Sequence, residues 1–425
     1  MKILCGPKTF DFSKTDSDLD VVLYSQAITS EQGCAGEPIA NQIKRRKLAP
    51  TPRAWDFLSI ALSCFSADLA GHRKKSPDGW TREFDLTIAV SDPIFWNSVT
   101  KDMEAALQFL STDIWSLKFV EGGFQPVPHK RAGYADGDSV ALLSGGMDSL
   151  IGAIDLESQG NRPITVSHVS RGDRDKQESF PKIIGNGLNS ILLSHAARVP
   201  NGETPSSQRS RSIIFIAYAV LISSCLDPKK AGSPKTCFVS ENGFISLNPP
   251  LTPMRVGSLS TRTTHPTYFK HLKTIFTLAG FDLLIQNNYS LKTKGEMLEE
   301  CKDQKLLKQI AHTSTSCGRY LYYGYNHCGR CVPCMVRRSA FLKWGVKDDT
   351  YYKFENLGIN NSDHAGFDDV RAAAIACLEE SEIGTRRWAG ATLDTTAIPD
   401  ESKHLEMLGR GLEEIRVLLK SYGVV

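Results

Sequence analysis

The chain has 425 residues, which is enough for two or three domains with a sizeable buried core. Hydrophobic residues make up 41% of it and charged residues 23%, and a net charge of +3 is too small to indicate a nucleic-acid partner by itself. No apolar run approaches the roughly 20 residues that cross a bilayer, and the start lacks the apolar region of a signal peptide, so we expect a cytoplasmic protein with no membrane partner.

Residues 1–135 contain no obvious chemical motif, and we expect an N-terminal α+β domain there. Strands are expected over 18–25, 84–90 and 114–120. Helices are expected over 51–65, with a Thr51 cap and Pro52 in the first turn, and over 93–110. Residues 27–50 are predicted to be a loop, whose basic run at 44–47 is more often solvated than bound to RNA or an acidic partner. Glycines and prolines over 122–133 predict a linker.

The stretch 139–154 carries the first chemical signal. Val140 to Leu143 form a short apolar run typical of a strand buried on both faces, two glycines follow, and an apolar helical stripe begins at Leu150. Asp148 and Ser149 stand where a helix N-cap is expected. This order directs backbone N–H groups and the positive end of a helix dipole at one point. The stretch therefore predicts an anion site of the kind that binds a nucleotide phosphate.

Each polar or small residue of this loop has a chemical reason to be there. The backbone at Gly145 and Gly146 can approach a phosphate, the hydroxyls of Ser144 and Ser149 can donate to its oxygens, and Asp148 can hold Mg²⁺. The six residues read Ser-Gly-Gly-Met-Asp-Ser and resemble the SGGxDS signature of the PP-loop ATP pyrophosphatases. The resemblance implies cleavage of ATP between its α and β phosphates with adenylation of a substrate oxygen; the alternative is an ordinary strand-to-helix turn.

From residue 138 onward strands and helices alternate, which predicts a parallel, Rossmann-like α/β sheet. Further strands are expected over 164–169, 236–239 and 283–286, and helices over 183–195 and 213–226. Right-handed crossovers bring the strand ends to the edge that carries the 144–149 loop. Glu241 follows one of these strands, so we expect it to face the nucleotide or its acceptor.

Several charged side chains near helix starts are candidate ligand contacts. Arg209 and Arg211 precede a helix, where the dipole disfavours a cation, so phosphate binding is one explanation and a solvated loop is the other. Lys294 begins another helix and would be well used against phosphate. Arg262 and His265 belong to a polar, aromatic segment, 261–268, that is suited to orienting a planar polar ligand.

Four of the eleven cysteines crowd into eighteen residues: Cys317, Cys328, Cys331 and Cys334. An odd number of cysteines in a large chain is not typical of a disulfide scaffold, and this spacing permits one tetrahedral Zn²⁺ site. An iron–sulfur cluster is the competing interpretation. His327 is a rival ligand, although four thiolates already fill the coordination sphere of zinc. The cluster predicts a zinc-binding excursion from the α/β domain.

The loop at 144–149 and the late Cys…Cys-Gly-x-Cys-x-x-Cys-x-x-Arg cluster together resemble the QueC family, the 7-cyano-7-deazaguanine synthases. The string at 293–296, Thr-Lys-Gly-Glu, also resembles that family's, which makes Lys294 a catalytic and Glu296 a substrate-binding candidate; a helix cap explains Glu296 equally well. The resemblance covers about residues 138–345. It implies an adenine nucleotide alpha hydrolase-like enzyme that adenylates the carboxylate of 7-carboxy-7-deazaguanine, transfers it to ammonia and dehydrates the amide to a nitrile with a second ATP.

Two features depart from the compact synthases. Residues before 135 and after 345 have no counterpart there, and Glu241, Asn242 and Gly243 stand where the family has an Asp-Cys-Arg string. The longer architecture is similar to the QatC-type QueC-like proteins of bacterial anti-phage operons, with the type IV CBASS proteins as relatives. This similarity implies an activated deazaguanine that is delivered either to ammonia or to a protein amine, with a defence-operon protein as a candidate partner.

We therefore expect an N-terminal α+β domain (1–135), a PP-loop ATP pyrophosphatase domain with the zinc site (136–345), and a C-terminal helical extension (346–425) with amphipathic helices over 368–380 and 401–422. These tail helices either dock on the α/β domain or form an interface with a partner or second copy. The expected reaction uses ATP, Mg²⁺ and Zn²⁺, with Ser144, Asp148 and Lys294 as catalytic candidates. A PP-loop tRNA-modifying sulfurtransferase and an inactive nucleotide-binding scaffold subunit of a defence complex stay open as alternatives.

Overall fold

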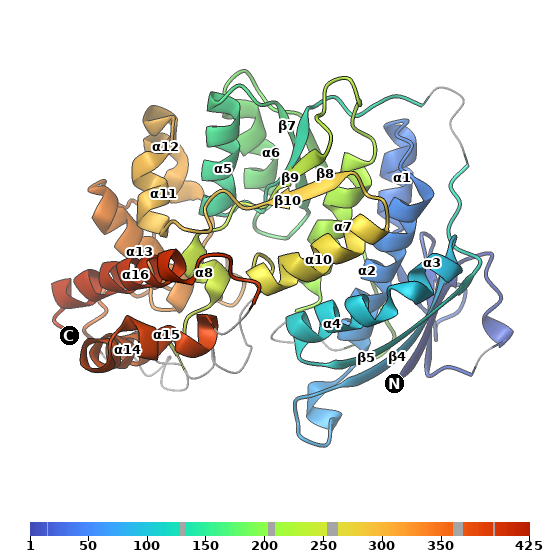
Figure 1. Ribbon diagram of the computed structural model, residues 1–425, viewed down its shortest axis with the longest axis horizontal. Helices are drawn as coiled ribbons and strands as arrows, with labels where there is room; N and C mark the ends of the chain where they lie inside the picture. Colours follow the sequence, from blue (N-terminus) through green and yellow to red (C-terminus); the bar gives the residue numbers. More distant parts are fainter. Residues whose placement is uncertain (15, 128–131, 203–208, 253–261, 360–368, 394–395) are drawn as a thin grey trace.

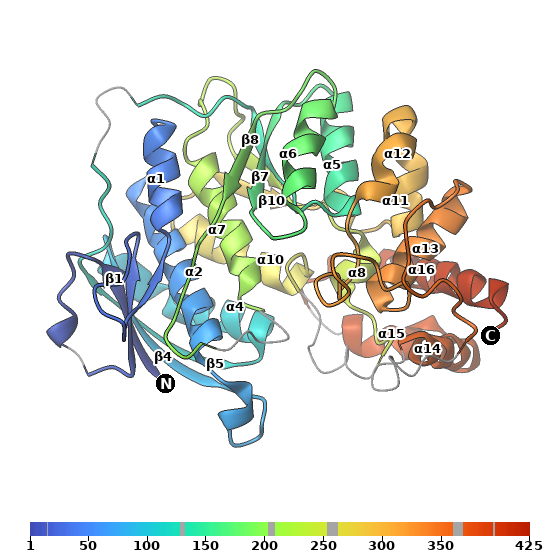
Figure 2. The same cartoon turned by 180° about the vertical axis from the view of Figure 1, so that it is seen from behind.

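The protein has two parallel sheets and a helical C-terminal region (Figures 1 and 2). The computed structural model describes residues 1–14, 16–127, 132–202, 209–252, 262–359, 369–393 and 396–425. Each sheet has five strands. If the strands of each sheet are numbered 1 to 5 in chain order, both sheets have the spatial order 3-2-1-4-5 when read from one edge. Residues 128–131 of the expected linker, together with Thr261 and Asp368, lie outside the described residues.

All strand pairs of the N-terminal sheet are parallel, so this region is α/β and the expectation of an α+β domain is wrong. The sheet also contains strands that the sequence did not indicate, at the N-terminus and within 27–50. Its order is β3-β2-β1-β4-β5, with β1 Lys2–Pro7, β2 Leu19–Leu23, β3 Gly33–Ala35, β4 Glu83–Val90 and β5 Ile114–Glu121.

The stretch 27–50 also holds a helix, α1 (Glu37–Arg45), where a loop was expected. Its start is marked by Gly36, whose φ of 90° is a left-handed conformation that favours glycine, and by Pro38 in the first turn. The basic run at 44–47 therefore lies at the end of a helix, where the dipole favours cations.

The second sheet begins at residue 139 and has the order β10-β9-β6-β7-β8. Its strands are β6 Ser139–Leu142, β7 Pro163–His168, β8 Ser190–Leu193, β9 Lys235–Phe238 and β10 Leu283–Gln286, and its first helices are α5 Met147–Ser158, α6 Arg174–Ile183 and α7 Arg211–Ser223. The helix expected over 183–195 is wrong: α6 ends where that helix was to begin, and β8 follows. Gly185 and Gly187 have φ values of 54° and 91°, which continue no right-handed helix.

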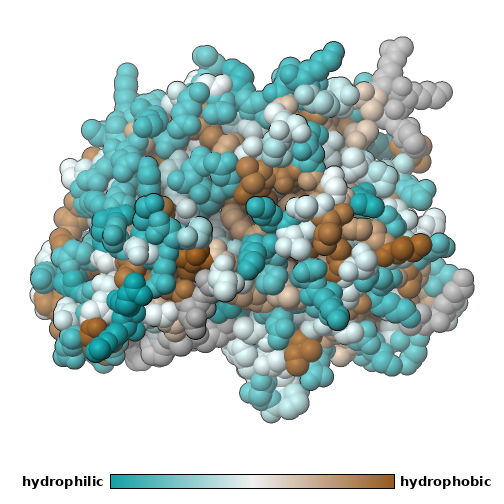
Figure 3. All heavy atoms as spheres, viewed as in Figure 1, coloured by the Kyte–Doolittle hydropathy of each residue, from teal (hydrophilic) through white to brown (hydrophobic). Residues whose placement is uncertain are grey.

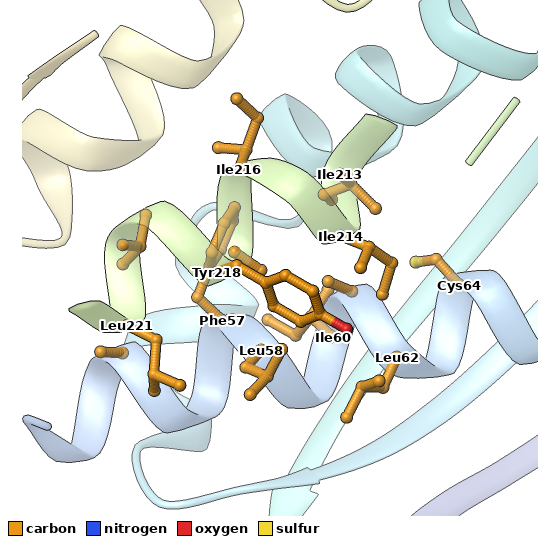
Figure 4. Close-up of a cluster of buried hydrophobic side chains, with 14 of the residues drawn as sticks. Phe57, Leu58, Ile60, Leu62, Cys64, Ile213, Ile214, Ile216, Tyr218 and Leu221 are labelled. Carbon is orange, nitrogen blue, oxygen red and sulfur yellow. The ribbon is translucent and has the colours of Figure 1, made fainter. Parts of the chain in front are cut away.

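Two buried helices join the sheets into one core. α2 (Pro52–Ala70) is apolar on nearly all sides and packs against β4 and against α7 (Figure 4). The predicted cap is confirmed, because the Thr51 hydroxyl accepts from the Ala54 N–H at 3.3 Å. A helix that is apolar all round must be covered on every face. Burial of each large side chain here contributes about 1.5–3 kcal/mol, so α2 and α7 hold the two sheets in fixed relation.

The remaining helices cover the sheets or build the C-terminal region. The helix expected over 93–110 is divided into two, and the C-terminal region has a third helix, α15, beside the two expected ones. Their bounds are α3 Pro93–Ser98, α4 Thr100–Ser111, α8 Gly243–Leu247, α10 Pro266–Leu278, α11 Lys294–Glu300, α12 Gln304–Ile310, α13 Val332–Trp344, α14 Asp369–Ile383, α15 Thr385–Leu393 and α16 Glu401–Ser421.

The C-terminal helices dock on the α/β part of the chain. α14, α15 and α16 share a core with α8 and α13 (Figures 1 and 2). On the face shown in Figure 3 hydrophilic side chains predominate, and hydrophobic ones gather in small separate groups. Within the described ranges no helix is both long and apolar enough to cross a membrane.

Candidate nucleotide site and metal centre

The predicted loop connects β6 to α5 and is closed by its own serines. The Ser149 hydroxyl accepts from the Ser144 N–H at 3.2 Å and donates to the Gly146 carbonyl at 3.0 Å. The Ser144 hydroxyl accepts from the Gly146 N–H at 3.1 Å. Gly145 has a φ of 89°, which favours glycine. The loop is thus held in one shape before any ligand binds, which lowers the entropic cost of binding.

Gly146, and not Asp148 or Ser149, is the N-cap of α5. It has an extended backbone and offers no side-chain oxygen to the first turn, a position where helix N-termini can accept an external anion. Asp148 instead lies within the first turn, on the inner side of the helix. Its side chain is therefore directed to other segments of the chain.

Asp148 forms a buried ion pair with Lys294. The Lys294 ammonium lies 2.5 Å from one carboxylate oxygen, and the two side chains are only 8% and 11% exposed. The other oxygen accepts two hydrogen bonds from Asn242, at 2.7 Å from the side-chain amide and at 3.1 Å from the backbone N–H. A carboxylate offers about four lone-pair positions, so these contacts leave capacity for a metal ion. The donor set fits Mg²⁺ binding at Asp148.

The two partners of Asp148 are both first-turn or cap residues of short helices. Asn242 caps α8 by accepting from the Ile245 N–H at 3.0 Å while its amide donates to Asp148. Lys294 begins α11 directly after the Thr293 cap. A cation at this end of a helix is unfavourable unless an anion lies beside it, and Asp148 supplies that anion. The contact with Asp148 therefore explains why a lysine occurs at this helix start, a position that the sequence already indicated as unfavourable for a cation.

These residues meet at the carboxyl-terminal edge of the second sheet, between β6 and β9. β6 is followed by a crossover to β7 on one side, whereas β9 lies on its other side, so the strand order reverses here. Ligands of open parallel sheets bind at such a point. The approach is close, because a Cβ at Gly152 of α5 would lie 2.0 Å from the Ser240 Oγ that follows β9. The site predicted from the loop thus lies at the edge where this fold can form one.

Four further residues beside the loop were not predicted: Lys176, Thr315, Tyr320 and Asp173. The Lys176 ammonium donates to Thr315 and, at 3.0 Å, to the Tyr320 hydroxyl, and it lies 3.5 Å from the Asp173 carboxylate. Thr315 in turn donates from its backbone to the Gly145 carbonyl at 3.0 Å. Lys176 therefore places a second ammonium group next to the glycine loop. No local pattern signals it, because α6 reads as an ordinary polar helix.

Arg209 and Arg211 lie at the start of α7, as expected, but in different surroundings. The Arg209 guanidinium is 3.4 Å from the Ser111 carbonyl of the N-terminal part and lies over the Trp80 ring. Burial, followed by the charge of Arg73, lowers the pKa of Arg209 to about 10. Arg211 lies 3.4 Å from the His168 ring and over Phe215. Phosphate binding by either arginine stays a prediction.

The expected substrate residues divide between the sheet edge and the helix caps. Glu241 immediately precedes Asn242 at the edge, and its carboxylate accepts from the Thr264 hydroxyl. The Arg262 guanidinium donates to the Phe109 carbonyl at 3.0 Å. His265 caps α10 by accepting from the Thr267 N–H at 3.2 Å. Substrate contact by Glu241, Arg262 and His265 stays a prediction.

Glu296 has structural partners on both sides. It completes a capping box with Thr293, and it lies 2.6 Å from Arg410 of α16. These contacts are enough to explain a glutamate at position 296 without a substrate. They also connect α11, the helix that carries Lys294, to the C-terminal region.

The four cysteines converge on one point and are all buried. Their sulfur atoms lie within 4.8 Å of one another, with 3.9 Å between Cys317 and Cys331 and between Cys328 and Cys334. A tetrahedral Zn²⁺ ion with Zn–S distances of about 2.3 Å requires sulfurs about 3.8 Å apart. Hydrogen bonding with the Cys317 side chain, and then with Cys331 and Cys334, lowers the pKa of the Cys328 thiol. The arrangement fits a single tetrahedral metal ion.

His327 is not a ligand in this arrangement. Its Nε2 accepts from the Ser316 N–H at 3.1 Å, and burial lowers the pKa of the ring to about 3, so the imidazole is neutral. Arg337 of α13 connects the cluster to the segments before and after it by donating to the Ser314 carbonyl and to the Thr350 hydroxyl. Thr315, which bonds to the glycine loop, lies two residues before Cys317. The cysteine cluster therefore lies next to a segment that contacts the glycine loop.

A separate cavity of about 440 Å³ lies at the opposite, amino-terminal edge of the same sheet. It is lined by exposed polar groups such as Asp136, Lys230 and Arg162, and Lys230 already pairs with Asp136 at 2.7 Å. None of the residues that line it begins a helix. The buried charges at the carboxyl-terminal edge are therefore the better indication of a nucleotide site.

No protein-family model, curated protein or solved structure matches this chain.

Proposed function

We propose that the protein is a QueC-like PP-loop ATP pyrophosphatase that adenylates the carboxylate of a 7-deazaguanine, 7-carboxy-7-deazaguanine, and transfers it to an amine. The observation that carries this proposal is the meeting of the glycine loop with Lys294 at the buried carboxylate of Asp148, at the point where the strand order reverses. An ordinary strand-to-helix turn gives no reason to bury a lysine there. Lysine and aspartate are rarely buried, and this pair lies at the edge where open parallel sheets bind ligands.

The proposed reaction has two steps. A carboxylate oxygen of the substrate attacks the α-phosphorus of ATP, the bond between the α-phosphorus and the bridging oxygen breaks, and pyrophosphate leaves. An amine nitrogen then attacks the carbonyl carbon of the acyl adenylate, AMP leaves, and the nitrogen loses a proton. The amine is ammonia, which gives the amide on the way to the nitrile, or a protein amine of a defence-operon partner.

The residues of the loop and its neighbours act by positioning and charge. In this proposal the loop from Ser144 to Ser149 binds the phosphates, and the Lys294 ammonium would neutralise charge on the leaving pyrophosphate. Mg²⁺ held at Asp148 would supply further charge neutralisation. No covalent nucleophile is required.

The remaining parts fit the same proposal. Glu241 lies beside Asn242, where its carboxylate can accept from the amidine edge of the base, and Arg262 and His265 lie on the segment that follows. The metal of the cysteine cluster is proposed to be Zn²⁺ with a structural role, because four thiolates leave no open position for a substrate.

The test is pyrophosphate release with 7-carboxy-7-deazaguanine, ATP, Mg²⁺ and ammonia as the amine. We expect AMP and pyrophosphate in equal amounts, dependence on the acid, and loss of the signal in Asp148→Asn. Lys230→Met, which removes an exposed ion pair from the far edge of the sheet, is the matched control and should keep full activity. ATP binding without any pyrophosphate release would favour the scaffold function, and an iron–sulfur cluster with tRNA-stimulated release would favour the sulfurtransferase.

A further inference from the structure

The C-terminal helix α16 lies across the two segments that carry the partners of Asp148. Asn242 begins α8 and Lys294 begins α11, and α16 lies beside α8 in both views (Figures 1 and 2). The three elements are far apart in sequence, and Asp148 is the group to which the first residues of both short helices point. α16 is therefore in a position to stabilise both the Asn242–Asp148 and the Lys294–Asp148 contacts.

The contacts between α16 and α11 are polar and partly buried. The Glu414 carboxylate accepts from the Thr293 hydroxyl and lies 3.2 Å from the Lys343 ammonium. One turn earlier, Arg410 lies 2.6 Å from Glu296 and donates to the Leu291 carbonyl at 3.1 Å. These bonds hold both sides of the turn from which Lys294 projects.

The Thr293 hydroxyl is the central link. A hydroxyl carries one proton, and here that proton goes to Glu414, which leaves the oxygen oriented to accept from the Glu296 N–H at 3.1 Å. This second bond is the N-cap of α11. Glu414 is buried, and desolvation raises its pKa, while Thr293 and Lys343 act in the opposite direction. Loss of the Glu414 carboxylate would thus release the cap that precedes Lys294.

The contacts between α16 and α8 are made by close packing at glycines. A Cβ at Gly243 would lie 2.9 Å from the Met407 Cε and 2.1 Å from the Ser290 carbonyl oxygen. A Cβ at Gly411 would lie 2.3 Å from the Phe244 ring. Packing this tight leaves no space for α8 to shift independently of α16. α16 therefore contacts both the start of α8, which Asn242 caps, and the start of α11, which Thr293 caps.

We infer that α16 positions Lys294 and Asn242 against Asp148, and that Glu414 is a positioning residue for phosphate chemistry at this site. The inference rests on the proposed function for its catalytic part. It gives the C-terminal extension, which has no counterpart in the compact synthases, a role in the reaction. Glu414 itself touches neither Asp148 nor the loop.

The test compares Glu414→Ala with Glu406→Ala, which removes an exposed carboxylate of the same helix. We expect Glu414→Ala to lower kcat for pyrophosphate release by about 10- to 100-fold, the effect of misplacing a charged group by about 1 Å, with a much smaller change in the KM for ATP. Glu414→Gln keeps an oxygen that can accept from Thr293 and should recover most of the kcat. Glu406→Ala should match the wild type.

A second measurement separates positioning from stability and from the proposed function. Hydrogen exchange of the backbone amides over 242–247 and 293–300 should become faster in Glu414→Ala and stay unchanged in Glu406→Ala. If Glu414→Ala does not fold, Arg410→Gln serves instead, with a smaller change in the same direction. Full kcat or unchanged exchange in the folded variant would overturn the inference. A wild-type protein that releases no pyrophosphate, but shows the exchange difference, would overturn the proposed function and leave the mechanical coupling through α16 established.

Discussion

Removal of the Lys294 ammonium is the perturbation that best probes the candidate site without assuming a substrate. Lys294→Met keeps most of the side-chain volume and leaves the Asp148 carboxylate with only the two hydrogen bonds from Asn242. Because the carboxylate is buried, water cannot replace the lost cation. The variant therefore measures the cost of an uncompensated charge at this edge of the sheet.

The expected loss follows from burial. Breaking a buried ion pair by removing one partner costs about 3–5 kcal/mol, and the remaining bonds from Asn242 place this case near 3 kcal/mol. Lys230→Met breaks a contact of similar length, 2.7 Å to Asp136, between side chains that are 56% and 73% exposed. An exposed pair of this kind contributes about 0–1 kcal/mol, so the two variants should differ by about 2 kcal/mol or more.

The assay is the free energy of unfolding from urea titration of the metal-loaded protein. Asp148→Asn combined with Lys294→Met should recover about 1–2 kcal/mol relative to Lys294→Met alone, because a neutral amide no longer needs the ammonium. Mg²⁺ and ATP together should stabilise the wild type and not the double variant. A loss in Lys294→Met equal to that in Lys230→Met, with additive effects in the double variant, would refute the reasoning.

Three further predictions concern activity, metal and pH. Asp148→Asn should lower pyrophosphate release by about 10²- to 10³-fold while circular dichroism stays unchanged, and retained turnover would show that the loop is not the site. Cys331→Ser should reduce bound zinc from one ion per chain to none, as measured by mass spectrometry of the metal, and should lower solubility, because a structural zinc site contributes on the order of 10 kcal/mol to local folding. Burial, followed by the charge of Arg262, lowers the pKa of His265 to about 4, so below pH 6.5 the unfolded chain binds a proton that the folded chain does not. His265 should therefore contribute about 2 kcal/mol to the fall in the free energy of unfolding between pH 8 and pH 5, measured as the difference between the wild type and His265→Gln, and a pH profile unchanged in His265→Gln would contradict this assignment.

The loop was predictable because its signals are local. An apolar strand, two glycines and a helical stripe within sixteen residues define the turn, and the structure confirms β6 and α5 on either side of it. The cap was predicted two or three positions too late, since the rule that favours aspartate and serine at caps does not consider a glycine that leaves room for an anion. Cysteine spacing was equally informative, because two short Cys-x-x-Cys steps bring sulfurs together whatever the rest of the fold.

The partners of Asp148 were not predictable from local pattern. Lys294 and Asn242 are 146 and 94 positions away, and only the order of strands in the sheet brings them to the same edge. Lys294 was selected for its unfavourable place at a helix start, which is a physical signal, whereas Asn242 and Lys176 gave none. Helix caps explain both asparagine and glutamate at such positions, so sequence alone does not separate a cap from a ligand.

The N-terminal sheet shows a second limit. The α+β expectation came from a mixture of expected strands and helices. β4 alternates apolar and polar residues, which is typical of a strand with one covered face. The direction of pairing is set by β1, which lies about eighty residues earlier and pairs in parallel with β4. Local alternation reports which face is covered and says nothing about the direction of the neighbouring strand.

The most direct test of the central claim follows the oxygen atoms of the carboxylate. With 7-carboxy-7-deazaguanine labelled with oxygen-18 in its carboxyl group, adenylation followed by transfer to an amine leaves one labelled oxygen in the phosphate of AMP. We predict one labelled oxygen in AMP for each amide formed, in the wild type and in Lys230→Met, and labelled AMP that is lower by about 10²- to 10³-fold in Asp148→Asn. Unlabelled AMP, or ADP as the nucleotide product, would contradict the account.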